Sequence, residues 1–359
     1  MRLHLLIGPS GLSTQRFRTM LKKKRQLLEK IKVISPEWNH IRLYMACSDP
    51  DQVGLVRYVR GFADGAAQEA LYRHLHSQLE QTLERAPADK LVLSSGQLGG
   101  LMTRPSELER LKSFLTAFTD DIHITMYLCE QSRLMLPLYE EYVMDGRTNP
   151  LTMELDLTSE KSWWDASLAM HGENEPELNH FNHIQYPAQW MDYERLIALW
   201  EDTFGKGSVT PRPLDLDDLN SEHACKELAQ VLDIEEPLGV IDPDPGPPTH
   251  SAVTIARARQ MNDVLMRYGK VRQVSIPADL WKSMAYEVRR RGPAMQAGEL
   301  HKISDYFKPM NKRLIKAYPQ LDHACFTPPD PVGDGTLQEV DTLFGFRASQ
   351  YLTAGRYRI

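Results

Sequence analysis

The first 146 residues alternate between short apolar segments typical of strands and amphipathic segments typical of helices. Apolar runs at 2–7, 90–95 and 122–128 predict strands, and apolar residues at helical spacing predict helices at 66–86 and 105–119. Parallel strands joined by crossover helices produce this alternation. The sequence therefore predicts an α/β fold with a doubly wound, mostly parallel sheet. The other elements predicted in this half are a strand at 41–47 (IRLYMAC) and a helix at 130–144.

A turn and a basic helix follow the first apolar run. Residues 8–11 (GPSG) form the turn, and we expect a helix over 14–32 with Ser13 as its N-cap. The free N–H groups of a first helical turn and the helix dipole together favour an anion. The phosphate-loop pattern GxxxxGK[ST] is absent, because Ser13 stands in place of the second glycine and no lysine follows. The segment predicts either an anion site of unusual sequence or a strand–turn–helix without a ligand.

The carboxyl ends of the predicted strands are where ligands of doubly wound sheets bind. The segments at these ends are 8–14, 94–97 and 129–133. Cys129 ends the third predicted strand, close to Arg133, so its thiol is either one of lowered pKa or a buried structural group. We expect any site in this half to be built from these three segments.

Residues 147–188 are more polar and contain His180 and His183. We interpret this long excursion as a substrate or lid loop. The HxxH spacing could hold a metal, but no further ligands lie nearby, so we expect no metal and an exposed polar loop is the alternative. The two histidines are candidates for a general base.

The C-terminal half is predicted to be mainly helical. A strongly amphipathic helix is expected at 188–204 and a short edge strand at 207–213. A proline-rich break at 242–249 precedes three helices within 250–320. The predicted helices of that part lie at 251–268, 278–291 and 299–317.

Composition excludes several classes of protein. The chain has 359 residues, of which 42% are hydrophobic and 25% charged, which fits one large or two ordinary globular domains. The net charge of -6 argues against a nucleic-acid partner. No apolar run approaches the length of a membrane span, the N-terminus lacks a signal-peptide pattern, and the four cysteines form no CxxC. We expect a cytoplasmic protein with reduced thiols.

Several motifs occur in an order that matches a known family. They are LLIGPSGLSTQRF at 5–17, LVLSSGQL at 91–98, YLCEQSRLMLPLY at 127–139, YERLIALWEDTFG at 193–205, HSAVTIARARQMN at 250–262 and NKRLIKAYP at 311–319. In this order the chain resembles the bacterial sulfotransferase-like proteins of the P-loop type. The resemblance implies a P-loop-type three-layer sandwich with a helical C-terminal half. It covers 1–333 as a single domain, with a tail at 334–359.

The resemblance also implies an activity. Such proteins bind 3′-phosphoadenosine 5′-phosphosulfate (PAPS) and transfer its sulfuryl group, here to a carbohydrate or small hydroxyl acceptor. His180 and His183 are the candidate catalytic bases. The candidate cofactor-binding residues are Ser10, Gly11, Leu12, Ser13 and Thr14 of the first loop, Cys129 at the position of a 3′-phosphate arginine, and Arg16 and Arg133 as replacement cations.

This sequence departs from the family at residues that matter for chemistry. Gly11 occupies the position of the loop lysine, Gly96 that of the glutamate in SSE, and Pro137 that of the serine that holds the 3′-phosphate. Transfer of this kind depends on positioning and electrostatics, so lost cations weigh heavily. The second hypothesis is therefore a non-catalytic relative with a lost cofactor site, acting as a binding or interaction protein with a protein partner.

Overall fold

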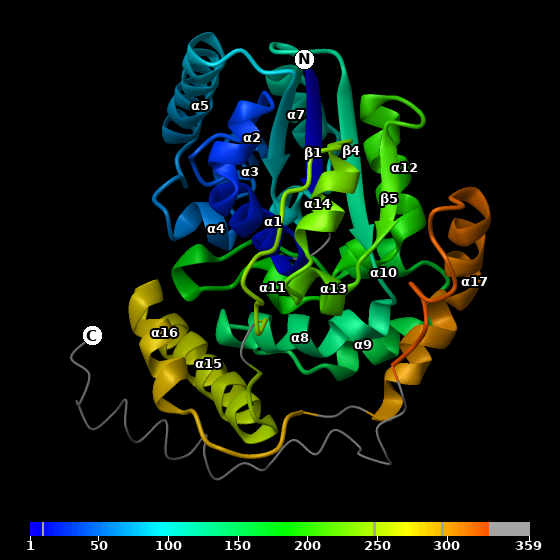
Figure 1. Ribbon diagram of the computed structural model, residues 1–359. Coiled ribbons are helices and arrows are strands. Elements are labelled where there is room, and N and C mark those ends of the chain that lie inside the picture. The colour runs from blue at the N-terminus through cyan, green and yellow to red at the C-terminus, as the bar shows by residue number, and fades with distance from the viewer. Residues whose placement is uncertain (9–10, 247–248, 296–297, 330–359) are drawn as a thin grey trace.

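The computed structural model describes residues 1–8, 11–246, 249–295 and 298–329, without the side chains of 11–13. Its centre is a sheet of five parallel strands in the order β2-β3-β1-β4-β5 (Figure 1). This confirms the predicted α/β class with a parallel sheet. The strands are β1 (Arg2–Ile7), β2 (Val33–Ile34), β3 (Lys90–Ser94), β4 (Ile122–Leu128) and β5 (Val209–Pro213).

β1 is the middle strand, and both of its neighbours come later in the chain. Leu3 pairs with Leu91 of β3 on one side and with Ile122 of β4 on the other. Leu5 and Leu6, whose side chains point to opposite faces of the sheet, are both fully buried, as a strand covered on both faces requires. The apolar run at the N-terminus is therefore the core of the sheet.

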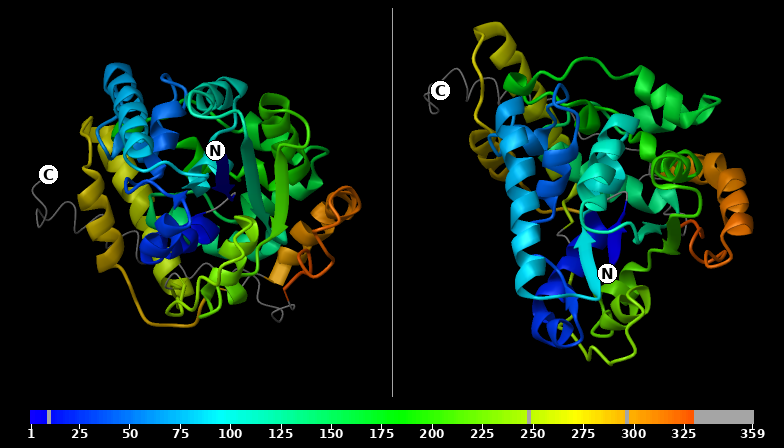
Figure 2. Two further views of the ribbon diagram at one scale, coloured as in Figure 1. Left: turned by 45° about the horizontal axis from the view of Figure 1, so that its top comes forward. Right: turned by 90° about the horizontal axis from the view of Figure 1, so that it is seen from above.

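Helices cover both faces of the sheet and give three layers (Figures 1 and 2). α1, α13 and α14 lie on one face, and α7 and α12 on the other. The helices up to α7 are α1 (Gly11–Lys23), α2 (Arg25–Lys30), α3 (Ile41–Cys47), α4 (Leu55–Tyr58), α5 (Gly65–Arg85), α6 (Gly96–Leu101) and α7 (Pro105–Thr116). The next are α8 (Gln131–Met144), α9 (Thr152–Asp156), α10 (Trp163–Ala169), α11 (Asn182–Gln185), α12 (Tyr193–Phe204), α13 (Leu216–Asn220) and α14 (Cys225–Val231).

Two predicted elements of the first half differ from the structure. Residues 41–47 form helix α3 rather than a strand, and the edge strand of that side is β2. The basic helix predicted at 14–32 is two helices, α1 and α2, and α1 begins at Gly11. Ser13 lies inside α1 and is therefore not its N-cap.

The segment 147–188 is folded on the molecule as short helical turns. Trp163 of α10 is fully buried and its Nε1–H donates to the carbonyl of Ala188 at 2.9 Å. The buried guanidinium of Arg147 pairs with the carboxylate of Glu154 in α9. This polar stretch is thus anchored by buried residues.

The C-terminal half is helical, as predicted. It consists of α15 (Ala252–Arg272), α16 (Ala278–Glu287) and α17 (His301–Ala317). α15 and α17 both pack on α8. Gln131 of α8 and Asn311 of α17 exchange two amide hydrogen bonds of 3.1 and 2.9 Å. Within the described residues no helix is both long and apolar enough to cross a membrane.

Candidate functional site

The chain leaves β1 toward β2 on one side of the sheet and leaves β3 toward β4 on the other side, so the topological switch point lies between β1 and β3. A ligand of this sheet is expected at the carboxyl ends of these two strands. Helix α6 packs against the carboxyl end of β1. A Cβ atom added to Gly99 would lie 2.5 Å from the carbonyl oxygen of Gly8, directly after β1. Only glycine allows the two backbones to approach so closely. The end of β1 is thus covered by backbone on the α6 side.

Helix α1 leaves β1 through the first loop, where five candidate cofactor residues lie. Ser10 is outside the described residues, and Gly11, Leu12 and Ser13 form the first turn of α1. Thr14 is buried, and its carbonyl accepts a 3.5 Å hydrogen bond from the Ser94 hydroxyl at the end of β3. The N-terminal turn of α1 therefore lies beside the ends of β1 and β3, as the sequence led us to expect.

Arg16 is buried and engaged in holding another part of the fold. Its Nε–H donates to the carbonyl of Leu219 at 2.8 Å, and Nη2 donates to those of Ser221 and Asp242 at 3.1 and 2.8 Å. The side chain is only 4% exposed. The guanidinium therefore fastens the 219–242 segment onto α1 and is not a free cation for a phosphosulfate.

Cys129 and Arg133 lie at the end of β4 but differ in their surroundings. Cys129 is buried, its carbonyl accepts a hydrogen bond from the Tyr193 hydroxyl at 3.0 Å, and burial raises the pKa of its thiol. This supports the structural role and not an activated thiolate. Arg133 is exposed, and its Nε–H donates to the carbonyl of Thr327 at 2.9 Å.

His180 and His183 are only three positions apart in the sequence, but their surroundings differ. His180 forms a backbone bridge with Glu175, and burial lowers its pKa. His183 lies beside Gly54, where a Cβ atom would approach its ring to 3.5 Å. Burial and then the nearby His171 lower the pKa of His183 to about 4. A base of that pKa is weak at neutral pH, which does not favour His183 for proton abstraction.

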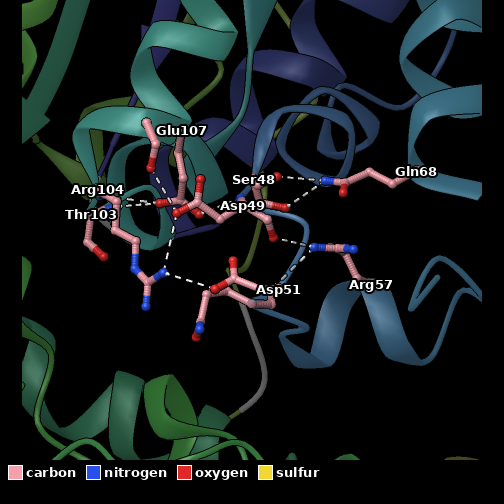
Figure 3. Close-up of polar contacts among 10 residues, drawn as sticks. Ser48, Asp49, Asp51, Arg57, Gln68, Thr103, Arg104 and Glu107 are labelled. Carbon is pink, nitrogen blue, oxygen red and sulfur yellow. Dashed lines mark hydrogen bonds and ion pairs between the residues drawn. The ribbon is translucent and has the colours of Figure 1, made fainter. Parts of the chain in front are cut away.

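A polar cluster that the sequence did not reveal lies next to α6, buried at Arg57, Gln68 and Glu107 and exposed at Arg104. We call it the Asp49–Glu107 cluster; its members are Asp49, Arg57, Gln68, Arg104 and Glu107 (Figure 3). Figure 3 shows Arg57 and Gln68 reaching the chain around Asp49 from one side, and Arg104 and Glu107 from the other. The cluster joins the loop after α3 to the start of α7.

Glu107 is the hub of this cluster. Its carboxylate accepts backbone N–H groups from Asp49 at 3.1 Å, Thr103 at 3.0 Å and Arg104 at 3.3 Å. Burial raises its pKa to about 7, although these three donors favour the ionised form. Because both oxygens are already used, we assign Glu107 to fastening the loops. The glutamate three residues into α7 is a capping-box pattern, which could have indicated this role.

Arg57 and Gln68 bind main-chain carbonyls in the same cluster. Arg57 is fully buried and donates to the carbonyls of Asp49, Gln52, Pro50 and Phe62. The Gln68 amide donates to the carbonyls of Met45 and Ser48 at 2.8 and 2.7 Å. These contacts fix the loop after α3, so we assign a structural role to Arg57 and Gln68.

Comparisons of the chain with protein-family models, with curated proteins and with solved structures find no match. Among the residues that the structure describes, no group of three or more His, Cys, Asp or Glu side chains is placed to hold a metal ion. The parallel sheet and its order are therefore the basis on which a function can be argued.

Proposed function

We propose that this chain is a non-catalytic relative of the P-loop sulfotransferase-like proteins, acting as a binding or interaction protein. The observation that carries the proposal is the engagement of Arg16 with three main-chain carbonyls of the 219–242 segment. A cation that holds the fold in this way cannot also neutralise a phosphosulfate without releasing that segment.

The other described residues agree with this proposal. Cys129 is buried with a raised pKa where a 3′-phosphate arginine is expected by resemblance. Pro137 lies within α8 and offers neither a hydroxyl nor an N–H group. His183 is neutral and a weak base near pH 7. These residues do not fit PAPS.

One observation favours the second candidate, a PAPS-dependent sulfotransferase acting on a carbohydrate or small hydroxyl. The N-terminal turn of α1 lies beside the ends of β1 and β3, where backbone N–H groups and the helix dipole attract an anion. In this alternative Arg133 would supply the cation, since it is exposed.

Calorimetric and thermal-shift titration with 3′-phosphoadenosine 5′-phosphate separates the two candidates. We expect no binding up to millimolar nucleotide. Saturable binding would overturn the proposal, because a ligand at a hundred times its Kd stabilises a fold by about 2.7 kcal/mol. Titrations of R133A and of K22A, which removes an exposed charge of α1, would then identify the cation. Inorganic sulfate in parallel distinguishes nucleotide recognition from general anion binding at the helix end.

A further inference from the structure

A groove of about 500 Å³ lies on the side of the molecule formed by α4, the turn at 175–178 and the end of α15. This volume is within the range of small-molecule sites. Its lining comes from three segments far apart in the sequence, around Tyr58, Glu175 and Lys270. None of the candidate cofactor-binding residues lines it. The lining residues are Val53, Tyr58, Ala63, Glu175, Pro176, Glu177, Leu178, Gly269, Lys270, Gln273 and Val274.

The walls of this groove are held in place by hydrogen bonds and close packing. The 174–182 turn is fixed to the chain before α4, because the Asn174 amide donates to the carbonyl of Val53 at 3.2 Å. On the other side, a Cβ atom on Gly269 would lie 3.0 Å from both Leu178 and the carbonyl of Val274. The turn therefore packs directly on α15. A groove that exists before its ligand arrives avoids the cost of ordering its walls.

The lining of the groove carries more negative than positive charge. Glu175 and Glu177 are exposed carboxylates of the lining, and Lys270 is the basic residue opposite. Within the described ranges none of these three side chains takes part in an ion pair. α15 has 21 residues and ends at Arg272, so the negative end of its dipole also lies at the groove, where Lys270 and Arg272 of the last turn partly offset it. Two carboxylates and one lysine give the lining a net negative charge, which favours a cation.

The remaining lining is apolar and includes an aromatic ring. Val53, Ala63, Leu178 and Val274 present aliphatic groups, and Tyr58 presents a half-buried ring. An aromatic face attracts an organic ammonium ion in addition to its hydrophobic contact. The groove thus offers carboxylates for a charged head and apolar surface for a body.

We propose that this groove binds a primary ammonium ion attached to an apolar body, with the ammonium group between Glu175 and Glu177 and the body against Tyr58 and Val274. The proposal does not depend on the sulfotransferase resemblance. It assigns a ligand class to a surface remote in sequence from the strand ends. A carboxylate on the same ligand would meet Lys270.

The probe is 2-phenylethylamine, titrated calorimetrically into the full chain. Its neutral and anionic counterparts, 2-phenylethanol and 3-phenylpropionate, measure how much the ammonium contributes. We expect 1:1 binding of the amine, at least about tenfold tighter than that of the alcohol, and no measurable binding of the acid. Equal affinity for amine and alcohol would overturn the proposal, and so would no binding of the amine at millimolar concentration.

Variants at exposed positions locate the binding. The double variant E175Q/E177Q should weaken amine binding by about tenfold or more, while E173Q, an exposed carboxylate outside the lining, should leave it unchanged. A63W places a large side chain into the groove and should abolish binding. Binding that survives both the double variant and A63W would place the amine elsewhere and refute the assignment.

The same chemistry is found in free amines and in the N-terminus of a peptide. Titration with the dipeptide Phe-Gly and with its N-acetylated form distinguishes these sources. Binding of both the amine and the free dipeptide, but not of the acetylated form, indicates a peptide N-terminus, and binding of 2-phenylethylamine but of neither peptide indicates a small amine. Because nucleotide titration uses another surface, failure here leaves the test of the proposed function intact.

Discussion

Arg147 and Glu154 meet in a bidentate ion pair away from water. Nη1 and Nη2 of Arg147 lie 2.7 and 2.8 Å from the two carboxylate oxygens of Glu154, and the side chains are 1% and 6% exposed. The guanidinium also lies over the ring of Tyr139, 5.0 Å from its centroid. This pair anchors α9 to the segment that follows α8.

Replacing Glu154 with Gln should lower the free energy of unfolding by about 3–5 kcal/mol, because it leaves a buried guanidinium without its counter-charge. The matched control is E194Q. Glu194 pairs with Arg313 on the surface, where such a pair contributes about 1 kcal/mol or less. Urea unfolding of both variants measures the difference. Similar losses would mean that the Arg147 pair is solvated in solution.

Replacing Gly99 with Ala should destabilise the fold by about 1–3 kcal/mol, since the added methyl group meets the Gly8 carbonyl at 2.5 Å and the backbone has to move. G65A is the control, because nothing lies within 4 Å of a Cβ at that helix position. Thermal unfolding should show a lower Tm for G99A and an unchanged or slightly higher Tm for G65A. An unchanged Tm for G99A would contradict the close approach of α6 to β1.

Replacing Arg16 with Met should cost about 2–4 kcal/mol, because three carbonyls lose a charged donor. The loss should be accompanied by faster amide exchange or proteolysis within 219–242, the segment that Arg16 holds. K22M, at an exposed position of the same helix, should change neither quantity. If proteolysis of that segment stays at the wild-type rate in R16M, the fastening role is wrong.

Acid should destabilise the protein through His40. This side chain is 3% exposed, its Nδ1 accepts the Ser94 N–H at 2.8 Å, and burial lowers its pKa to about 4. The unfolded chain, with a pKa near 6.5, binds one more proton between pH 6.5 and 4, so the free energy of unfolding falls as pH falls through that range. Above pH 6.5 the group contributes no pH dependence.

The H40Q variant isolates this effect. Its free energy of unfolding should depend less steeply on pH between 4 and 6.5, by up to one proton, or about 1.4 kcal/mol per pH unit. H74Q, on the exposed face of α5, is the matched control. Equal slopes for wild type and H40Q would show that His40 titrates normally in the folded protein.

Apolar runs predicted the strands of the sheet well, whereas periodicity failed to identify a helix whose residues are nearly all buried. The strands at 2–7 and 122–128 were predicted with the bounds of β1 and β4, because apolar runs of that length between helices are typical of parallel strands. In α3 nearly every side chain is buried, from Ile41 to Cys47. A short run without a polar face has no period, so helix and strand cannot be distinguished from it.

The candidate site was predictable in place but not in role. Sequence reasoning placed the first turn of α1 beside the strand ends, since parallel topology brings them together. It could not assign Arg16, whose acceptors lie 203 to 226 residues away in the chain. The Asp49–Glu107 cluster was missed for the same reason: Glu107 accepts the N–H of Asp49 across 58 residues.

The central position of β1 has a consequence for biosynthesis. Among the strands that the structure describes, β1 leaves the ribosome first and needs partners on both sides, and the second of these partners, β4, ends only at Leu128. At bacterial and eukaryotic elongation rates the apolar run waits on the order of 10 s for that partner. During this interval the nascent chain carries an unpaired, two-sided strand, which is the kind of segment that holding chaperones protect from aggregation.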